Sequence, residues 1–435
     1  MDPISLIHRL RWEDLPADVR ARAPLALLDL IGVAAGGLGT DMSRIARDHA
    51  AAVFGGTRPI LFDGRTASAP GVALAAGITI DALDAHDGYN PSKGHIGCPL
   101  ISGILAIAPD GLSGAEALAT LVMGYEFGAR AAEAQHGTVP DYHTTGSWGA
   151  VVAAAAGSRL VGLDDAHTRE ALGIAEYHGP RSQMMRCVDE PTMVKDGPGW
   201  GAMAGISAVL LAQNGFTGAP AITVEQAPEY WTGIGSDWRI FRQYFKPYPV
   251  CRWAQAPVEG VLALKRAHGL TSEQVARIRV ETFHESVRLA TRRPVTTEQA
   301  QYSTSFPCAV ALVRDGIGAA DVMGDSLTDP EILRLSDGMI FTEDDAANAA
   351  FPLTRLARVT LELHDGTTLT GDWMQPRWDH DAPPTDAELR TKYHSLADPV
   401  LGQTRASAIE AAIDALPSTP FSALTDLLNN APDSK

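Results

Sequence analysis

Apolar residues recur at three- and four-residue spacing along most of the first 268 residues, which is the pattern of helices that bury one face. The predicted helices cover residues 23–37, 43–54, 69–85, 99–107, 113–134, 147–161, 164–177, 199–214 and 254–268. Ser113 and Glu116 have the spacing of a capping box at the start of one of them. Many of these segments are apolar on most sides and rich in small residues, so we expect them to pack centrally against one another.

The periodicity changes after residue 268, where apolar and polar residues begin to alternate as they do in half-buried strands. The predicted strands cover residues 275–283, 357–363 and 367–373, and the predicted helices between them cover 296–313 and 329–335. Asp365-Gly366 separates the last two strands and is a strong hairpin signal. This part of the chain is therefore predicted to be a smaller α+β unit.

Two hydrophobic cores are also expected from length, because 435 residues exceed what one core usually supports. A second capping box, Thr385 to Glu388, opens helical segments that we expect to return to the larger domain. The predicted fold is therefore mainly α. It has a helical domain of residues 1–268, completed by 393–435, and an α+β lid domain of residues 269–392.

Composition narrows the range of ligands. A formal charge of −17 disfavours nucleic acid and acidic membrane surfaces, and no apolar run reaches the length of a membrane span. The N-terminal residues lack an export signal. The four cysteines lie far apart in the sequence without a C-x-x-C pair, which fits reduced thiols better than disulfides or a zinc site. We therefore expect a cytoplasmic protein whose ligand is a small molecule.

One segment concentrates polar chemistry between two apolar helices. Residues 84–95 contain six ionisable side chains and two glycines. Charged groups withdrawn from water must be paired or shifted in pKa, so such a cluster is a candidate source of acids and bases.

Four motifs together resemble the MmgE/PrpD family over nearly the whole chain. They are Leu83-Asp84-Ala85-His86-Asp87 with His95 downstream, Tyr142-His143-Thr144-Thr145-Gly146-Ser147-Trp148-Gly149-Ala150, Lys195 ahead of Gly199-Trp200-Gly201-Ala202-Met203-Ala204-Gly205, and Phe245-Lys246-Pro247-Tyr248-Pro249. The resemblance implies a large helical domain, a smaller α+β lid, a homodimer and a cofactor-free active site between the domains. The family includes 2-methylcitrate dehydratase, cis-aconitate decarboxylase and iminodisuccinate epimerase.

The resemblance also implies which residues form the catalytic site. The catalytic candidates are Asp84, His95, His143, Lys195 and Lys246, and the substrate-binding candidates are His86, Lys93, Tyr142, Thr145 and Arg252. Histidine supplies a base near neutral pH, and lysine or arginine neutralises carboxylates and developing enolate charge. The chain departs from dehydratase and decarboxylase members at one place, where His86-Asp87-Gly88 replaces Asp-Asp-Thr or Asn-Asp-Thr.

Several functions stay open at this point. We favour a lyase that removes water or carbon dioxide from a small di- or tricarboxylate, with an epimerase of an amino- or imino-dicarboxylate as the alternative. A non-catalytic binding protein of enzymatic descent is the third hypothesis. Asp84, His86, Asp87 and His95 are all metal-ligand types, but no metal motif supports a metal site, and Gly197 to Gly201 lacks the features of a phosphate loop.

Overall fold

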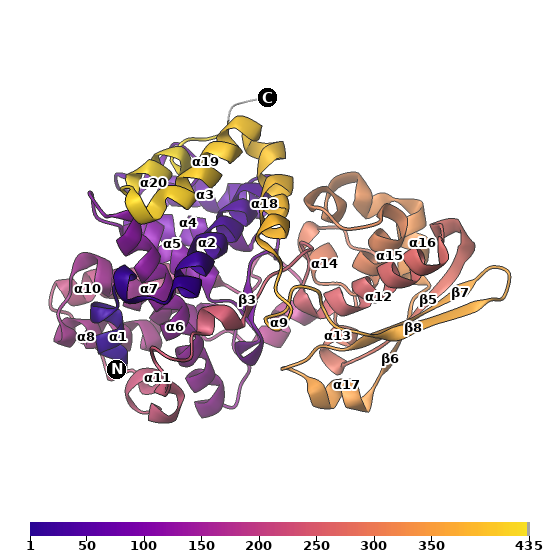
Figure 1. Cartoon of the computed structure of the whole chain (residues 1–435), viewed down its shortest axis with the longest axis horizontal. Coiled ribbons are helices and arrows are strands. Elements are labelled where there is room, and N and C mark those ends of the chain that lie inside the picture. The colour runs from indigo at the N-terminus through magenta and orange to yellow at the C-terminus, as the bar shows by residue number, and fades with distance from the viewer. Residues whose placement is uncertain (433–435) are drawn as a thin grey trace.

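Two domains lie side by side in the computed structural model, which describes residues 1–432 (Figure 1). The larger domain is helical and contains the N-terminus and the last three helices of the chain. Its helices are α1 (Pro3–Arg9), α2 (Ala17–Gly37), α3 (Asp41–Val53), α4 (Ala69–Asp81), α5 (Gly97–Ile107), α6 (Gly114–Thr138), α7 (Gly146–Val161), α8 (Asp165–His178), α9 (Met184–Asp189), α10 (Pro198–Gln213), α11 (Ile222–Glu225), α18 (Asp386–Leu401), α19 (Gln403–Ala415) and α20 (Ser422–Leu428). The fold is mainly α with a smaller α+β domain, as predicted.

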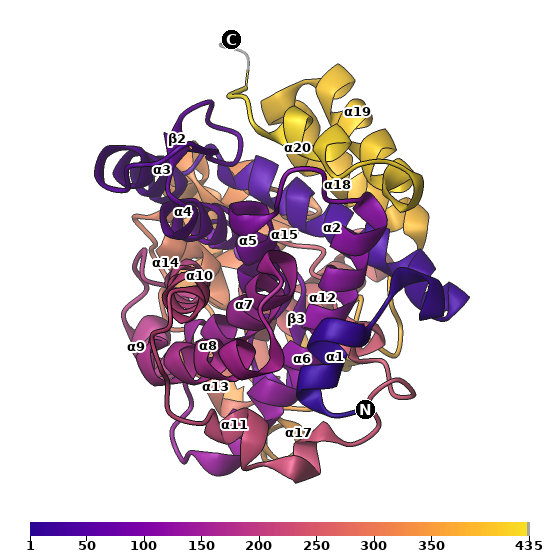
Figure 2. The ribbon, with the colours of Figure 1, turned by 90° about the vertical axis from the view of Figure 1, so that its left-hand side faces the viewer.

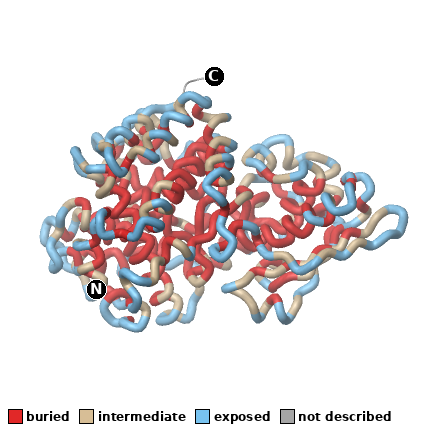
Figure 3. Tube along the Cα trace, in the orientation of Figure 1, coloured by how far each residue is buried: buried red, intermediate tan, exposed pale blue. Residues whose placement is uncertain are grey.

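Helices α4, α5 and α7 form the centre of the larger domain, and α10 packs against all three (Figures 2 and 3). Small residues allow these backbones to approach closely. A Cβ atom on Gly205 would lie 2.2 Å from the carbonyl oxygen of Ala150, and one on Gly77 would lie 2.5 Å from the Cα of Gly199. Any side chain at these glycines would force the helices apart, so the small residues set the spacing of the core.

The smaller domain is a four-stranded sheet with helices packed on it (Figure 1). Its elements are α12 (Arg252–His268), β5 (Val275–Thr282), α13 (His284–Arg288), α14 (Thr297–Gln301), α15 (Ser305–Arg314), α16 (Pro330–Asp337), β6 (Ile340–Glu343), α17 (Asp345–Ala350), β7 (Ala357–Leu363) and β8 (Thr368–Met374). The strand order is β6-β5-β7-β8, and only the β5–β6 pair is parallel. The predicted hairpin is confirmed: Leu363 N–H donates to the Thr367 carbonyl at 2.8 Å, and Gly366 has a φ of +91°.

Two predicted helices are shorter than the periodicity indicated, and both differences have a local cause. The helix predicted over 69–85 ends at Asp81, and Asp84 has a φ of +49° that no α-helix accommodates. The helix predicted over 296–313 is interrupted between α14 and α15. There the Ser303 hydroxyl accepts a hydrogen bond from Phe306 N–H at 3.0 Å, which replaces a helical backbone bond.

Helix α12 follows the segment that joins the two domains, and it packs with the sheet of the smaller domain. Helix α12 packs against α15, β7 and β8, although the sequence pattern assigned it to the helical domain. We therefore propose that the smaller domain begins with α12. At the other junction, the capping box of Thr385 and Glu388 opens α18, which packs along α2. Lys392 on α18 donates to Asp29 Oδ1 at 2.5 Å and to the Ala85 carbonyl at 2.7 Å.

No single described helix is both long enough and apolar enough to cross a membrane. Helices α2 and α3 meet that test only when they are taken together, and the chain bends by 93° between them. Most of α2 is buried among the other helices.

Candidate active site

The loop between α4 and α5 is pinned by a short two-stranded pairing. Strand β3 (Gly88–Tyr89) pairs antiparallel with β4 (Gln243–Tyr244). A Cβ atom on Gly88 would lie 2.3 Å from the Tyr244 hydroxyl oxygen. The glycine that stands in place of threonine therefore makes room for the Tyr244 side chain, so the departure at this position has a packing cause.

Three predicted site residues have left-handed backbone conformations. The φ angles of Asp84, Lys93 and Lys195 are 49°, 52° and 41°. This conformation costs a non-glycine residue about 1–2 kcal/mol, and it is concentrated at functional sites. The surrounding contacts must therefore hold these residues in place.

A small cavity that contains His95 lies where the two domains meet. Its volume is about 20 Å³, which is room for about one water molecule. This His95 cavity is lined by Asp84, Lys93, His95, Met184, Asp196, Tyr244, Lys246, Cys251, Arg252, Trp253, Tyr302 and Arg355.

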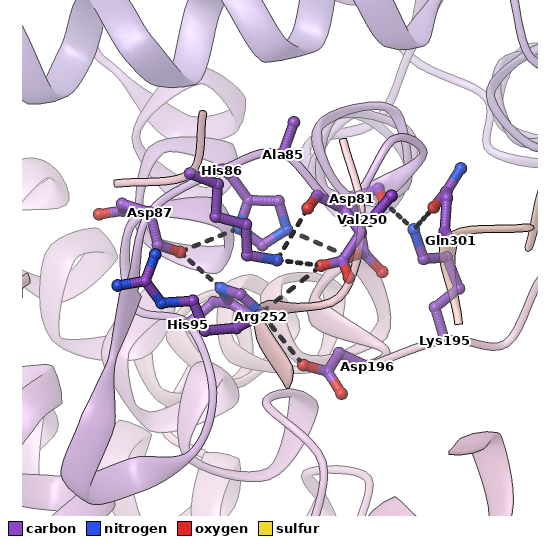
Figure 4. Close-up of polar contacts among 12 residues, drawn as sticks. Asp81, Ala85, His86, Asp87, His95, Lys195, Asp196, Val250, Arg252 and Gln301 are labelled. Carbon is purple, nitrogen blue, oxygen red and sulfur yellow. Dashed lines mark hydrogen bonds and ion pairs between the residues drawn. The ribbon is translucent and has the colours of Figure 1, made fainter. Parts of the chain in front are cut away.

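The His95 imidazole lies between two carboxyl groups in this cavity (Figure 4). Its Nε2 is 3.8 Å from Asp84 Oδ1 and 3.5 Å from Asp196 Oδ2. Its Nδ1 is hydrogen-bonded to the carbonyl oxygen of Asp87, which can only accept, so Nδ1 carries the proton and Nε2 is the free base. Burial, aided by the neighbouring His86, holds the pKa of His95 well below its usual value. His95 is therefore neutral and able to accept a proton.

The two carboxyl groups beside His95 are in opposite electrostatic surroundings. Lys246 Nζ donates to Asp84 Oδ1 at 2.6 Å and to the Asp84 carbonyl at 2.7 Å. Burial raises the pKa of Asp84, but Lys246 and Lys195 act in the opposite direction and His95 adds to their effect, so the net pKa is lowered. Asp196 makes no ion pair with lysine or arginine within residues 1–432, and burial, together with the Asp81 carboxylate, raises its pKa to about 8. At neutral pH one group is ionised and the other is protonated.

His86 lies behind His95 and does not reach the cavity. Its ring is fully buried, with Nε2 3.1 Å from Asp81 Oδ1 and its centroid 4.2 Å from that of His95. Burial lowers the pKa of His86 to about 3, so the ring is neutral. The expectation that His86 binds substrate directly needs an accessible ring, and the ring has no accessible face. We assign His86 instead to the positioning of His95.

Lys195 connects the domains at the edge of the site (Figure 4). Its Nζ donates to the carbonyl oxygen of Asp81 and, at 2.7 Å, to Gln301 Oε1. Gln301 belongs to α14 and in turn donates to the Ala82 carbonyl at 3.0 Å. Lys195 lines a neighbouring cavity rather than the one that contains His95.

Residues of the Tyr142-to-Thr145 motif form hydrogen bonds with residues that line the cavity. The Tyr142 hydroxyl donates to the Lys93 carbonyl at 2.6 Å, and the Thr145 hydroxyl donates to Asp196 Oδ2 at 3.2 Å. His143 is bonded through Nδ1 to a backbone carbonyl two residues earlier. None of the three predicted residues lines the His95 cavity.

Two cations in the cavity have no carboxylate partner in the described part of the chain. Lys93 Nζ lies 3.9 Å from the centroid of the Tyr142 ring, and burial lowers its pKa. Arg355 is buried and donates to Asn90 Oδ1, while its Nε has no partner. Arg252, which was also predicted to bind substrate, lines the cavity and donates to Asp379 Oδ2 at 2.9 Å. Lys93 and Arg355 are therefore the cations best placed to receive carboxylates.

The neighbouring cavity has a volume of about 650 Å³ and shares a wall with the His95 cavity. Helix α9 contributes Met184 to the His95 cavity and Arg186 and Cys187 to the larger one. The next two residues of this wall also face different cavities, since Lys195 lines the larger cavity and Asp196 lines the His95 cavity. Asp189, at the end of α9, is ion-paired with Arg288 of α13, so this wall is fastened to the smaller domain.

Asp84, His86 and His95 bring potential metal-ligand atoms within 4.8 Å of one another. The Asp84 carboxylate is already neutralised by Lys246, and both ring nitrogens of His86 are hydrogen-bonded. We therefore do not assign a metal site to these residues.

Two family models match most of this chain. The MmgE/PrpD N-terminal domain model matches residues 4–230, and the MmgE/PrpD C-terminal domain model matches residues 248–417. The chain belongs to the MmgE/PrpD family. A cis-aconitate decarboxylase of Aspergillus terreus is 24% identical over 97% of this chain and 94% of its own length. A cis-aconitate decarboxylase-like protein of Aspergillus oryzae is 24% identical (93% and 91%), and the human cis-aconitate decarboxylase is 24% identical (86% and 83%).

This MmgE/PrpD protein also has cavity residues that the sequence did not single out as site candidates. Among them are Asp196, Tyr244, Tyr302 and Arg355. Asp196 directly follows Lys195, and that adjacency was a usable signal. Arg355 lies in an irregular segment between α17 and β7, where no periodicity distinguishes it from a surface residue.

Proposed function

We propose that this protein is a lyase that removes carbon dioxide, or in the related reaction water, from a small di- or tricarboxylate. One observation carries the proposal. The neutral base His95 lies between an ionised carboxylate and a protonated carboxyl group in a cavity that also presents two cations free of acidic partners. Such a site can bind carboxylates and move a proton at an adjacent carbon with side chains alone. The similarity to cis-aconitate decarboxylases supports the decarboxylase form.

The reaction can be tested directly with cis-aconitate. Purified protein is incubated with this compound, carbon dioxide release is measured, and the product is followed by proton magnetic resonance. We expect carbon dioxide and an unsaturated product in equal amounts. Citrate-like compounds tested in parallel would show loss of water instead if the dehydratase form is correct.

An epimerase acting on an amino- or imino-dicarboxylate is a second candidate. It is supported by Lys93, which lines the cavity and whose pKa is lowered by burial, because a second acid/base group is what an epimerase needs. Inversion of recovered substrate without loss of carbon dioxide or water would favour this function.

The two partnerless cations give a prediction about substrate affinity. Arg355→Met is expected to raise KM about 10- to 100-fold with little change in kcat, because a charge-assisted hydrogen bond to a carboxylate contributes about 1.5–3 kcal/mol. Steady-state kinetics measures KM for Arg355→Met and for a control, Arg279→Met. The control removes an arginine on the exposed face of the sheet. An unchanged KM for Arg355→Met would exclude this arginine as a carboxylate ligand.

We also propose that the protein forms a homodimer. Trp200 and Leu211 on α10, and Val194 just before it, are exposed large apolar side chains, which is typical of a surface covered by a partner.

A further inference from the structure

Asp196 is the one carboxyl group of the cavity that no cation neutralises, and its environment points to a chemical role. The residue is 2% exposed, and its Oδ1 has no hydrogen-bond partner. Its Oδ2 lies 3.5 Å from His95 Nε2 and accepts a hydrogen bond from Thr145. Because His95 carries its proton on Nδ1, its Nε2 can accept a hydrogen bond from a protonated Asp196.

The groups around Asp196 favour its protonated form. Burial is the largest influence, the nearby carboxylates of Asp81 and Asp84 act in the same direction, and Lys246 and the Thr145 hydroxyl oppose them. Other titratable groups interact with it from α5, from α9 and from the adjoining segments, namely Cys98, Cys187, Cys251, Tyr142 and Tyr302. Burial raises the pKa of each of these groups, so they are uncharged at neutral pH.

We propose that Asp196 is the general acid of this site, a role that rests on the lyase function proposed above. In decarboxylation the bond between a substrate carbon and a carboxylate breaks, and carbon dioxide leaves. The electron pair of that bond stays with the substrate, where it forms a new carbon–hydrogen bond with the proton of Asp196. Asp196 becomes a carboxylate and regains a proton from solvent after the product leaves. In this scheme Asp84 stays ionised, and its ion pair keeps Lys246 beside the reacting groups.

The test compares the wild-type enzyme with Asp196→Asn and with Asp110→Asn, an exposed aspartate remote from the cavity. Asp196→Asn is expected to lower kcat by about 10²–10⁴-fold, the usual contribution of a general acid, while KM changes only a few-fold. In the wild type, kcat/KM is expected to fall as the pH rises through about 8, because the acid form is then lost. This decrease at high pH, the alkaline limb of the pH profile, should be absent from the residual activity of Asp196→Asn and unchanged in Asp110→Asn.

A second variant separates chemistry from structural damage. Thr145→Val removes the hydroxyl that stabilises the ionised form of Asp196, so the alkaline limb should move to higher pH. In infrared spectra, the difference between wild type and folded Asp196→Asn should contain the carbonyl stretch of one protonated carboxyl, which is lost as the pH rises through about 8. Asp87 and Glu126, whose pKa values burial raises to about 7, contribute to both proteins and cancel in the difference.

The outcomes are distinguishable. An active wild type whose Asp196→Asn variant retains kcat within about threefold and keeps the alkaline limb would overturn the role of Asp196 and leave the lyase function standing. A wild type that transforms no di- or tricarboxylate would overturn the lyase function, and with it this role.

Discussion

Lys246→Met is expected to destabilise the folded protein by about 3–5 kcal/mol at neutral pH and to abolish turnover. The substitution leaves the Asp84 carboxylate buried without the ammonium group that donates to it at 2.6 Å. A buried charge that loses its partner keeps the full cost of its removal from water. Urea denaturation at pH 7 measures the change in the free energy of unfolding, and the carbon dioxide assay measures turnover.

A double substitution provides the control for this prediction. Lys246→Met combined with Asp84→Asn removes both charges, so most of the lost stability should return while activity does not. A single variant that stays within about 1 kcal/mol of wild type would show that Asp84 is not an ionised, buried partner of Lys246.

The same pair makes stability depend on pH. The folded-state pKa of Asp84 is lowered, so this stabilising contribution is complete above the ordinary pKa of an aspartate. It is lost as the pH falls through the lowered value, because the carboxylate then becomes protonated. The double variant, which lacks the pair, should therefore lose less stability than wild type on acidification.

His95→Asn is expected to lower kcat by about 10²–10⁴-fold while the protein remains folded. Asparagine can keep a hydrogen bond to the Asp87 carbonyl, but it has no counterpart of the imidazole Nε2, which in the proposed scheme accepts a hydrogen bond from the protonated Asp196. Steady-state kinetics and circular dichroism measure the two quantities. His364→Asn, in the exposed hairpin loop, is the matched control. Turnover by His95→Asn within threefold of wild type would remove His95 from the mechanism.

Much of the fold follows from local patterns. Helices such as α7 and α10 were predicted within a residue or two because each is a long run of small apolar residues, and the β7–β8 hairpin followed from Asp365-Gly366. The break between α14 and α15 was missed because apolar spacing continues through Ser303, whose backbone forms an isolated bridge with Ala290 while its hydroxyl caps Phe306 N–H. Periodicity reports which face is buried and does not report such tertiary contacts.

The site shows the same division. The residue types of Asp84, His95 and Lys246 suggested acid–base chemistry, but the contact of Lys246 with Asp84 joins positions 162 residues apart and could not be derived from spacing. Asp196 was missed because its chemistry depends on burial and on the lack of a lysine or arginine ion pair within residues 1–432, which are properties of the folded environment. The reason for glycine at position 88 was also not visible in the sequence, since the Tyr244 side chain that needs the space comes from β4.

The central claim is that this site moves a proton at a carbon next to a carboxylate as that carboxylate departs. The most direct measurement is incubation of the wild-type protein with cis-aconitate in heavy water, followed by mass spectrometry of product and recovered substrate. The lyase account predicts one carbon-bound deuterium in each product molecule, formed together with one carbon dioxide. Recovered substrate of unchanged mass with no product, repeated for citrate-like and amino-dicarboxylate compounds, would contradict it.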